Sequence, residues 1–219
     1  MSAPLSGRRV LVSAGPTYED IDPVRFLGNR SSGKMGFAIA AAARARGAEV
    51  VLVAGPVHLD TPDGVRRIDV RSAAQMHAAV VGALPADVYI GAAAVADFTP
   101  RQVSAHKIKK TAGSETLVLE LVRTTDVLAE VAAHRQRPAL VVGFAAETHD
   151  VERYARGKLA SKRLDLIAAN LVGAAEGGFE RDDNTLHVYW DSGECRLGPA
   201  SKHEVAAALV DLVARRLPA

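Results

Sequence analysis

Two lysines four residues apart are the residues whose type and spacing most directly suggest chemistry in this chain. Lys158 and Lys162 fall in a strongly charged segment, 150–163, that has the pattern of an exposed helix. Residues four apart lie on one helix face, where two like charges repel each other and an anionic ligand would relieve the repulsion. The spacing therefore predicts an anion site, with plain solvation of both lysines as the alternative.

Three shorter patterns suggest other chemistry but lack the residues that it needs. Residues 28–34, GNRSSGK, fit a phosphate loop, yet Met35 stands where such a loop needs a serine or threonine to hold Mg²⁺. Tyr154 and Lys158 have the spacing of short-chain dehydrogenases, but no glycine-rich fingerprint follows the first predicted strand. Cys195 is far in sequence from any convincing histidine and aspartate partners, and a lone cysteine is more often a small apolar residue.

Composition and charge exclude several classes of protein. The 219 residues include 27 lysines and arginines against 25 acidic residues, and this small net charge argues against a nucleic-acid coat or a polybasic membrane anchor. One cysteine forms neither an internal disulfide nor a cysteine zinc cage, so we expect a reducing, cytoplasmic location. No apolar run reaches the ~18 residues that span a bilayer, and no signal peptide is expected.

Strand-like and helix-like segments alternate, and they must position these residues. Several strand candidates are apolar on both faces, which is typical of a parallel sheet covered by helices on both sides. We predict a Rossmann-like, doubly wound α/β fold with ligands beyond the carboxyl ends of the strands. The predicted strands are 9–14, 49–55, 65–70, 87–95, 116–122, 139–146 and 165–170; the predicted helices are 33–46, 72–84, 126–135, 150–163 and one that begins at Ser201, with Ser31, Ser32 and Gly33 capping the first.

The C-terminal part and two long loops depart from this alternation. Residues 184–198 predict a β-hairpin around Asp191-Ser192-Gly193, which would extend the sheet or pair with another subunit. The loops 15–32 and 97–115 exceed the length of ordinary connections, so we expect them to be functional or mobile. We interpret residues 1–219 as one nucleotide-binding ligase domain, with 184–198 as a candidate dimerisation hairpin.

Four segments together resemble the bacterial phosphopantothenate–cysteine ligases. They are SAGPTYEDIDPVRFLGNRSSGKMGFAIA (13–40), GAAAVADF (91–98), KIKK (107–110), and GFAAET with KLASKRLDLIAAN (143–170). The resemblance implies a step of coenzyme A biosynthesis: with Mg²⁺, CTP activates 4′-phosphopantothenate as an acyl-cytidylate and releases pyrophosphate. The amine of L-cysteine then displaces CMP to give 4′-phosphopantothenoylcysteine.

The resemblance also implies which residues bind the acid substrate and act in the reaction. Asn29 matches an asparagine that contacts the phosphopantothenoyl group and serves the second half-reaction, because a side-chain amide can donate to a carbonyl oxygen as it becomes an oxyanion. Arg25 matches an arginine suited to a phosphate or carboxylate, and Ala93 matches a small residue that leaves room for the ligand. Lys107 matches a lysine of a mobile flap that reaches the triphosphate, and is counted with Asn29 as catalytic.

The remaining residues implied by the resemblance bind the nucleotide. Asp97 ends a predicted strand where the family has a nucleotide-contacting aspartate. One departure is Thr124-Thr125, where many relatives have Asn-Pro, and it puts the backbone contact there in doubt. The other implied nucleotide-binding residues, besides Lys107, are Thr125, Asp126, Val127, Phe144, Lys158 and Lys162.

Partners and alternatives follow from the same reasoning. Enzymes of the family are dimers, so we expect a homodimer, with small-molecule substrates and neither nucleic acid nor membrane as partners. In many bacteria the ligase is fused to a flavin-dependent decarboxylase. That half is not in this sequence, which is either a free-standing form or an excised domain, and a phosphopantothenoylcysteine decarboxylase is a possible partner. Two alternatives stay open: an NAD(P)-binding Rossmann reductase, and a non-catalytic subunit that assembles with a decarboxylase.

Overall fold

A mainly parallel sheet of eight strands organises the computed structural model, which describes residues 3–110, 115–147, 149–171 and 183–218. The strand order is β12-β11-β10-β9-β6-β1-β4-β5, and only β11 and β12 run antiparallel to their neighbours. The sheet is confirmed as Rossmann-like with a C-terminal hairpin at one edge. Its strands are β1 (Arg9–Ala14), β4 (Glu49–Ala54), β5 (Arg66–Asp69), β6 (Val88–Gly91), β9 (Leu140–Glu147), β10 (Leu166–Leu171), β11 (Asp183–Trp190) and β12 (Gly193–Ser201).

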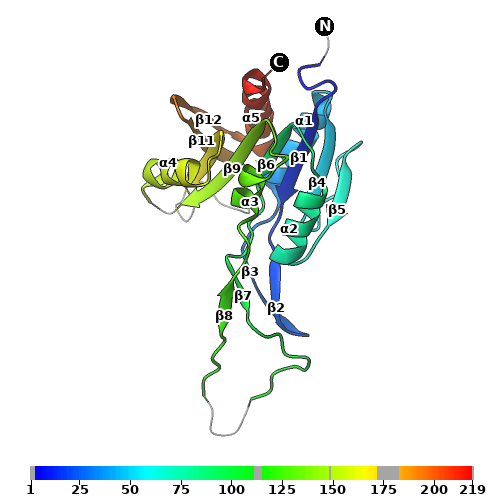
Figure 1. Ribbon diagram of the computed structural model, residues 1–219, viewed down its shortest axis with the longest axis vertical. Coiled ribbons are helices and arrows are strands. Elements are labelled where there is room, and N and C mark those ends of the chain that lie inside the picture. The colour runs from blue at the N-terminus through cyan, green and yellow to red at the C-terminus, as the bar shows by residue number, and fades with distance from the viewer. Residues whose placement is uncertain (1–2, 111–114, 148, 172–182, 219) are drawn as a thin grey trace.

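Helices cover both faces of this sheet (Figure 1). Alternate residues of each strand point to opposite faces, so Val10 and Val12 pack into one apolar cluster with α1 and α5, while Leu11 packs into the other with α2, α3 and α4. This burial on both sides explains why β1 lacks polar alternation. The five predicted helices are present, with ends that differ by a few residues: α1 (Lys34–Ala45), α2 (Ala73–Gly82), α3 (Val127–Ala133), α4 (Val151–Ser161) and α5 (Lys202–Arg216). No described helix combines the length and apolarity needed to cross a membrane.

Helix ends follow their predicted signals with one exception. Ser72 and Ser201 each form a capping box, with Gln75 and Glu204 respectively. The predicted serine cap of α1 is wrong. Gly33 itself is the N-cap residue, in the left-handed conformation (φ 75°), and no side chain caps the helix there.

Two short ribbons project from the sheet as an arm, which we define as residues 18–28, 98–110 and 115–123. The arm extends on the side opposite the two termini (Figure 1) and contains the antiparallel pairs β2 (Tyr18–Asp22) with β3 (Arg25–Gly28) and β7 (Phe98–Pro100) with β8 (Leu121–Arg123). The two segments predicted as long loops therefore each contribute strands to the arm.

Two strand predictions are wrong where the chain enters the arm. The predicted strand 87–95 ends at Gly91, and of the predicted strand 116–122 only the end forms a strand, β8. Val118 is 88% exposed, because the alternating valines and leucines of that segment have no second layer to pack against. The exposed large apolar side chains among the described residues all lie in the arm: Val24, Phe26, Phe98, Val103, Leu117, Val118 and Leu121.

The order of the strands reverses direction between β1 and β6. From β1 the chain proceeds through α1 to β4 on one side, whereas from β6 it proceeds to β9 on the other. In open α/β sheets the crevice beyond the carboxyl ends at such a switch point is the usual ligand site. The fold therefore places its candidate site beyond Ala14 and Gly91.

Gly36 allows α1 to approach β1 closely, and a matched pair of variants tests this packing. A Cβ atom at Gly36 would lie 2.4 Å from the Cβ of Ala14, whereas one at Gly157, within α4, would meet nothing within 4 Å. In Gly36→Ala an overpacking cost of about 1–3 kcal/mol opposes the ~1 kcal/mol that alanine gains over glycine in a helix. We expect Gly36→Ala to lower, and Gly157→Ala to raise, the free energy of unfolding in urea. Equal shifts in the two variants would contradict this account.

Candidate active site

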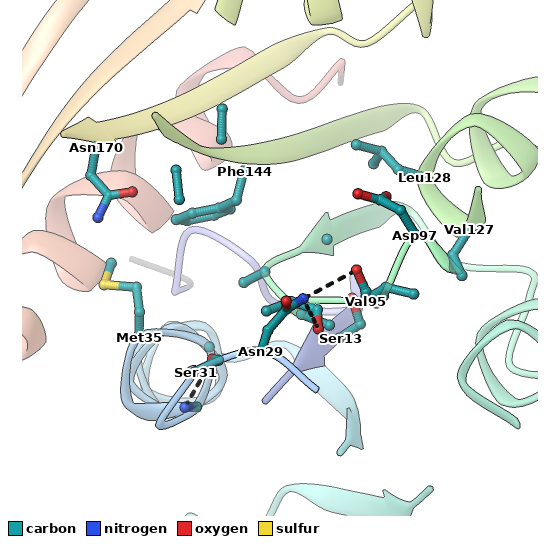
Figure 2. Close-up of a pocket in the computed structure, with 18 of the residues that line it drawn as sticks. Ser13, Asn29, Ser31, Met35, Val95, Asp97, Val127, Leu128, Phe144 and Asn170 are labelled. Atoms are coloured by element: carbon teal, nitrogen blue, oxygen red, sulfur yellow. Dashed lines mark hydrogen bonds between the residues drawn. The ribbon is translucent and has the colours of Figure 1, made fainter. Parts of the chain in front are cut away.

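A cavity of about 550 Å³ opens at the predicted switch point, beyond the carboxyl ends of β1, β6, β9 and β10. Figure 2 shows Phe144 near its middle, Asp97 and Val127 at one end, and Met35 and Asn170 at the other. Every predicted site residue except Arg25 and Lys107 lines this cavity: Asn29, Ala93, Asp97, Thr125, Asp126, Val127, Phe144, Lys158 and Lys162.

Backbone hydrogen bonds between the segments that follow β1 and β6 build the floor of the cavity. The amide of Ala92 donates to the carbonyl of Ser13 (3.0 Å), and that of Ala94 donates to the carbonyl of Gly15 (2.8 Å). The amide of Thr17 donates in turn to the carbonyl of Ala94 (3.2 Å). The floor is thus made of backbone and small side chains, among them Ala93, which leaves room for a ligand as the resemblance implies.

Asn29 is joined to this floor. It follows β3, and its Nδ2 donates to the carbonyl oxygens of Ala94 (3.0 Å) and Val95 (3.3 Å), drawn as dashed lines in Figure 2. The amide that the resemblance assigns to the acyl group is therefore already engaged with backbone. A ligand oxygen accepting from Asn29 would replace one of these two carbonyls.

The two lysines of α4 each contact a carboxylate. Lys158 lies 2.7 Å from Glu147 at the end of β9, and Lys162 lies 2.7 Å from Asp126. The repulsion that the spacing suggests between the two lysines is therefore reduced without a ligand, because each charge is balanced by an acid from another element. An anionic ligand that binds these lysines must therefore displace the carboxylate of Glu147 or Asp126.

Asp126 connects this ion pair to the start of α3. As the N-cap residue it accepts a hydrogen bond from the amide of Ala129 (3.0 Å). Burial by itself would raise the pKa of Asp126, but the bonds from Lys162 and the backbone amides outweigh burial and lower it. Because the pKa is lower in the folded protein, the stabilisation by this group is present at neutral pH and is lost as the pH falls below about 4.

Thr124 connects the start of α3 to the floor of the cavity. Its amide donates to the carbonyl of Asp97 (3.0 Å) and its Oγ1 donates to the carbonyl of Ala96 (2.6 Å). Thr124 therefore has a structural role at this edge, and both it and Thr125 line the cavity.

Tyr89 and Ser13 form a buried pair in the cavity wall. Their hydroxyl oxygens lie 3.0 Å apart, and both residues are about 1% exposed. Burial raises the pKa of Tyr89 to about 12, more than the hydrogen bond with Ser13 lowers it. The phenol is therefore neutral at physiological pH and serves as a hydrogen-bonding group rather than as a base.

Arg25 and Lys107 lie on the arm, outside the cavity. Arg25 binds Asp22 through Nε (3.0 Å) and Nη2, and Nη2 also donates to the carbonyl of Ile108 (2.7 Å). Asp22 accepts the amide of Ile108 (3.1 Å). Burial by itself would raise the pKa of Asp22, but these bonds from Arg25, Val24 and Ile108 hold it well below its usual range. Arg25 and Asp22 thus fasten the segment that carries Lys107 to β3.

Several residues of the cavity wall were not predicted from the sequence. Asn170 and Asn184 come from β10 and β11, Lys202 is the first residue of α5, and Met35 lies in the first turn of α1, partly buried against the core. A lysine just after a helix cap is ordinarily solvated, so the sequence around Lys202 carries no signal for a site. Within the described part of the chain, no three histidine, cysteine or acidic side chains gather as a metal site.

The attachment of the Lys107 segment can be tested by neutralising Asp22. In Asp22→Asn the charge-assisted bonds to Arg25 and Ile108 weaken, so we expect faster hydrogen exchange at the Ile108 amide, measured by mass spectrometry on a peptide covering 101–110. Asp20→Asn is the matched control: it removes a carboxylate from the same strand, but one that pairs with Arg71. Wild-type exchange in Asp22→Asn would contradict this attachment.

Comparisons with known proteins agree with this geometry. Residues 5–217 match the model of the DNA/pantothenate metabolism flavoprotein C-terminal domain. The coenzyme A biosynthesis bifunctional protein CoaBC of Vibrio cholerae is 51% identical over 210 residues, covering 95% of this chain and 53% of that protein. The chain therefore spans about half the length of the curated relatives it matches.

Solved structures show the same architecture. A crystal structure of the C-terminal domain of CoaBC has a TM-score of 0.83 and 40% identity, covering 99% of this chain and 98% of that one. A mutant of Cab2 in complex with phosphopantothenate-cysteine has a TM-score of 0.76 at 16% identity, covering 96% and 87%, and shares the fold. With nearly its whole length matched, the chain belongs to the DNA/pantothenate metabolism flavoprotein C-terminal domain family.

Proposed function

We propose that this chain ligates 4′-phosphopantothenate to L-cysteine at the expense of CTP, as a step of coenzyme A biosynthesis. The observation that carries the proposal is the convergence in one cavity of predicted site residues that come from β9, from α3 and α4 with their adjoining residues, and from the segments after β3 and β6. Family membership supports it, as does the structure of a protein of the same fold, a Cab2 mutant, in complex with phosphopantothenate-cysteine.

The reaction needs two displacements and no covalent enzyme intermediate. In the first, a carboxylate oxygen of phosphopantothenate attacks the α-phosphorus of CTP, the bond to the bridging oxygen breaks, and pyrophosphate leaves. In the second, the amine of cysteine attacks the acyl carbon, the bond to the cytidylate oxygen breaks, and CMP leaves as the amine loses a proton. The described residues that line the cavity include no histidine or cysteine, which suits direct displacement.

The end of the cavity with Lys158, Lys162 and Asp97 suits the triphosphate. A polyphosphate carries several charges and can displace the single carboxylates that now bind the lysines. Asn29, on the floor between the two ends, suits the acyl group (Figure 2). Lys107 would add a further cation when the arm segment that carries it reaches the nucleotide.

Mg²⁺ fits this end as a partner of the triphosphate. Magnesium is commonly held by one or two carboxylates together with substrate phosphates, and Asp97 and Asp126 are the aspartates among the described residues that line the cavity. Asp126 would be free to bind it once Lys162 turns to a phosphate. When bound, Mg²⁺ would neutralise charge on the pyrophosphate that leaves.

The alternative of an NAD(P)-binding reductase has no support here. A dinucleotide site needs a glycine-rich turn that leads directly from the first strand into a helix. In this chain β1 leads instead into the ribbon β2–β3, and α1 begins only at Lys34.

We also propose that the enzyme is a cytoplasmic homodimer and that a phosphopantothenoylcysteine decarboxylase uses its product. The hairpin 184–198 stays a prediction as the interface, although its edge strand β12 contains Pro199 and outward charges such as Glu194 and Arg196, which discourage strand pairing. The arm, with its exposed apolar side chains, is the surface better suited to a second copy.

The choice of nucleotide can be tested directly. We expect product from phosphopantothenate and cysteine to form faster with CTP than with ATP, GTP or UTP at equal concentrations. The physical reason is that a site built to hydrogen-bond one base edge leaves buried polar groups unpaired with another. Product is measured by mass spectrometry, and faster turnover with ATP would contradict the assignment.

The role of Asn29 can be tested by separating the half-reactions. Asn29→Asp replaces the donor amide by a negative acceptor, and loss of such a donor costs ~10²–10³ in rate. We expect the variant to release pyrophosphate in a single burst and to retain the acyl-cytidylate, seen by mass spectrometry after quenching with and without cysteine.

A second variant separates the donor role from damage to the floor, since Asn29→Asp also faces the carbonyls of Ala94 and Val95. Asn29→Ala removes the donor without adding repulsion and should accumulate the same intermediate. If neither variant accumulates it, and pyrophosphate release falls as far as product formation, Asn29 serves activation or binding instead.

A further inference from the structure

The end of the cavity opposite Asp97 is lined by a nearly buried lysine and by amide side chains. Lys202, the first residue of α5, lines this end although it is only 6% exposed. Asn184 lines it as well and is 7% exposed. Asn170 and Met35, which Figure 2 shows at the end away from Asp97, complete the wall. A cation and amide groups thus lie at a nearly buried end that the two half-reactions above leave unused.

Strand pairing brings these residues together from distant parts of the chain. Asn184 near the start of β11 pairs with Ala200 near the end of β12, and Lys202 follows two residues later. Asn170 near the end of β10 lies on the neighbouring strand, because β10 pairs with β11. The position of this end is therefore set by the sheet rather than by a loop.

The side-chain amide of Asn184 indicates a ligand, because its Nδ2 lacks a strong hydrogen-bond acceptor within the described chain. Its Oδ1 accepts the amide of Thr185 (2.9 Å), but within the described chain its Nδ2 has as acceptor only the thioether sulfur of Met35, at 3.9 Å. A thioether is a weak acceptor, and a buried amide that lacks a good one is costly. An anionic oxygen in the cavity would satisfy this amide.

We propose that Lys202 and Asn184 form a subsite for a phosphate monoester, namely the 4′-phosphate of the acid substrate. This inference rests on the proposed function. Phosphopantothenate carries its reacting carboxylate and its phosphate at opposite ends, so a carboxylate near Asn29 leaves the phosphate to bind away from the nucleotide. The zwitterionic cysteine fits this end less well, because Asp97 and Asp126, which could bind its ammonium group, line the opposite end.

Two variants with different effects on packing test the subsite. Lys202→Met keeps an unbranched side chain and removes the charge. Asn184→Asp is nearly isosteric and keeps the acceptor for Thr185, but it places a carboxylate where the phosphate would bind. We expect both to raise the Kd for phosphopantothenate in calorimetric titration, and its KM, by roughly 10- to 100-fold, the range of one charge-assisted contact. The KM values for CTP and cysteine should not change.

Controls separate this role from a structural one. Arg215→Met removes a cation from the last turn of the same helix, outside the cavity, and should leave all constants unchanged. A variant whose melting temperature and three KM values all shift together, or whose KM rises for cysteine alone, would overturn the subsite.

The same measurements distinguish a wrong subsite assignment from a wrong proposed function. Product formation by the wild type with an unchanged Kd for phosphopantothenate in both variants overturns the subsite alone. Wild-type protein that binds phosphopantothenate but forms no product with any nucleoside triphosphate overturns the proposed function, while loss of that binding in the variants still supports the subsite. Wild-type protein that does not bind phosphopantothenate overturns both.

Discussion

The pairing of backbones beyond the ends of β1 and β6 is the constraint on which the site depends. The two strands are neighbours, and the segments that follow them stay hydrogen-bonded through Gly15, Thr17 and Ala94 although the chain then leaves in different directions. The segment after β1 also packs tightly against the residue that follows β4, since a Cβ at Gly55 would lie 1.7 Å from the carbonyl oxygen of Pro16. The cavity beside this packed backbone is lined by small side chains, among them Ala92, Ala93 and Ala94, which leave space at the carboxyl edge of the sheet.

The charges of Lys158 and Lys162 in the cavity are balanced in the structure without a ligand, and this affects which anions the cavity can select. Lys158 and Lys162 are held by Glu147 and Asp126, so binding of an anion is an exchange of partners. These pairs are partly solvated and each is worth little by itself. A monoanion would gain almost nothing over the carboxylate that it replaces, whereas a triphosphate offers more charge to both lysines at once. The arrangement thus favours polyphosphates over simple carboxylates.

The sequence predicts features that depend on neighbouring residues, and it fails for features that depend on contacts between distant segments. The strand 9–14 was predicted at its observed bounds because its apolar pattern shows burial on both faces. The same kind of pattern over 116–122 was misleading, because alternation cannot reveal that no layer covers the segment in the arm. In the site, contiguous motifs predicted Asn29 and Lys162, and both residues line the cavity. Lys202 and Asn184 meet only through the register of β11 with β12, which no spacing along the chain reveals.

The arm explains why two residues implied by resemblance lie outside the cavity. Lys107 cannot approach a ligand alone without releasing Ile108 from both Asp22 and Arg25. Since Asp22 is buried and binds both groups, Arg25 and the Lys107 segment are held as one unit on β2 and β3. The same unit exposes Val24 and Phe26 to solvent. Covering these apolar side chains would give a gain in free energy for holding the arm in place, so the position of both cations depends on what the arm packs against.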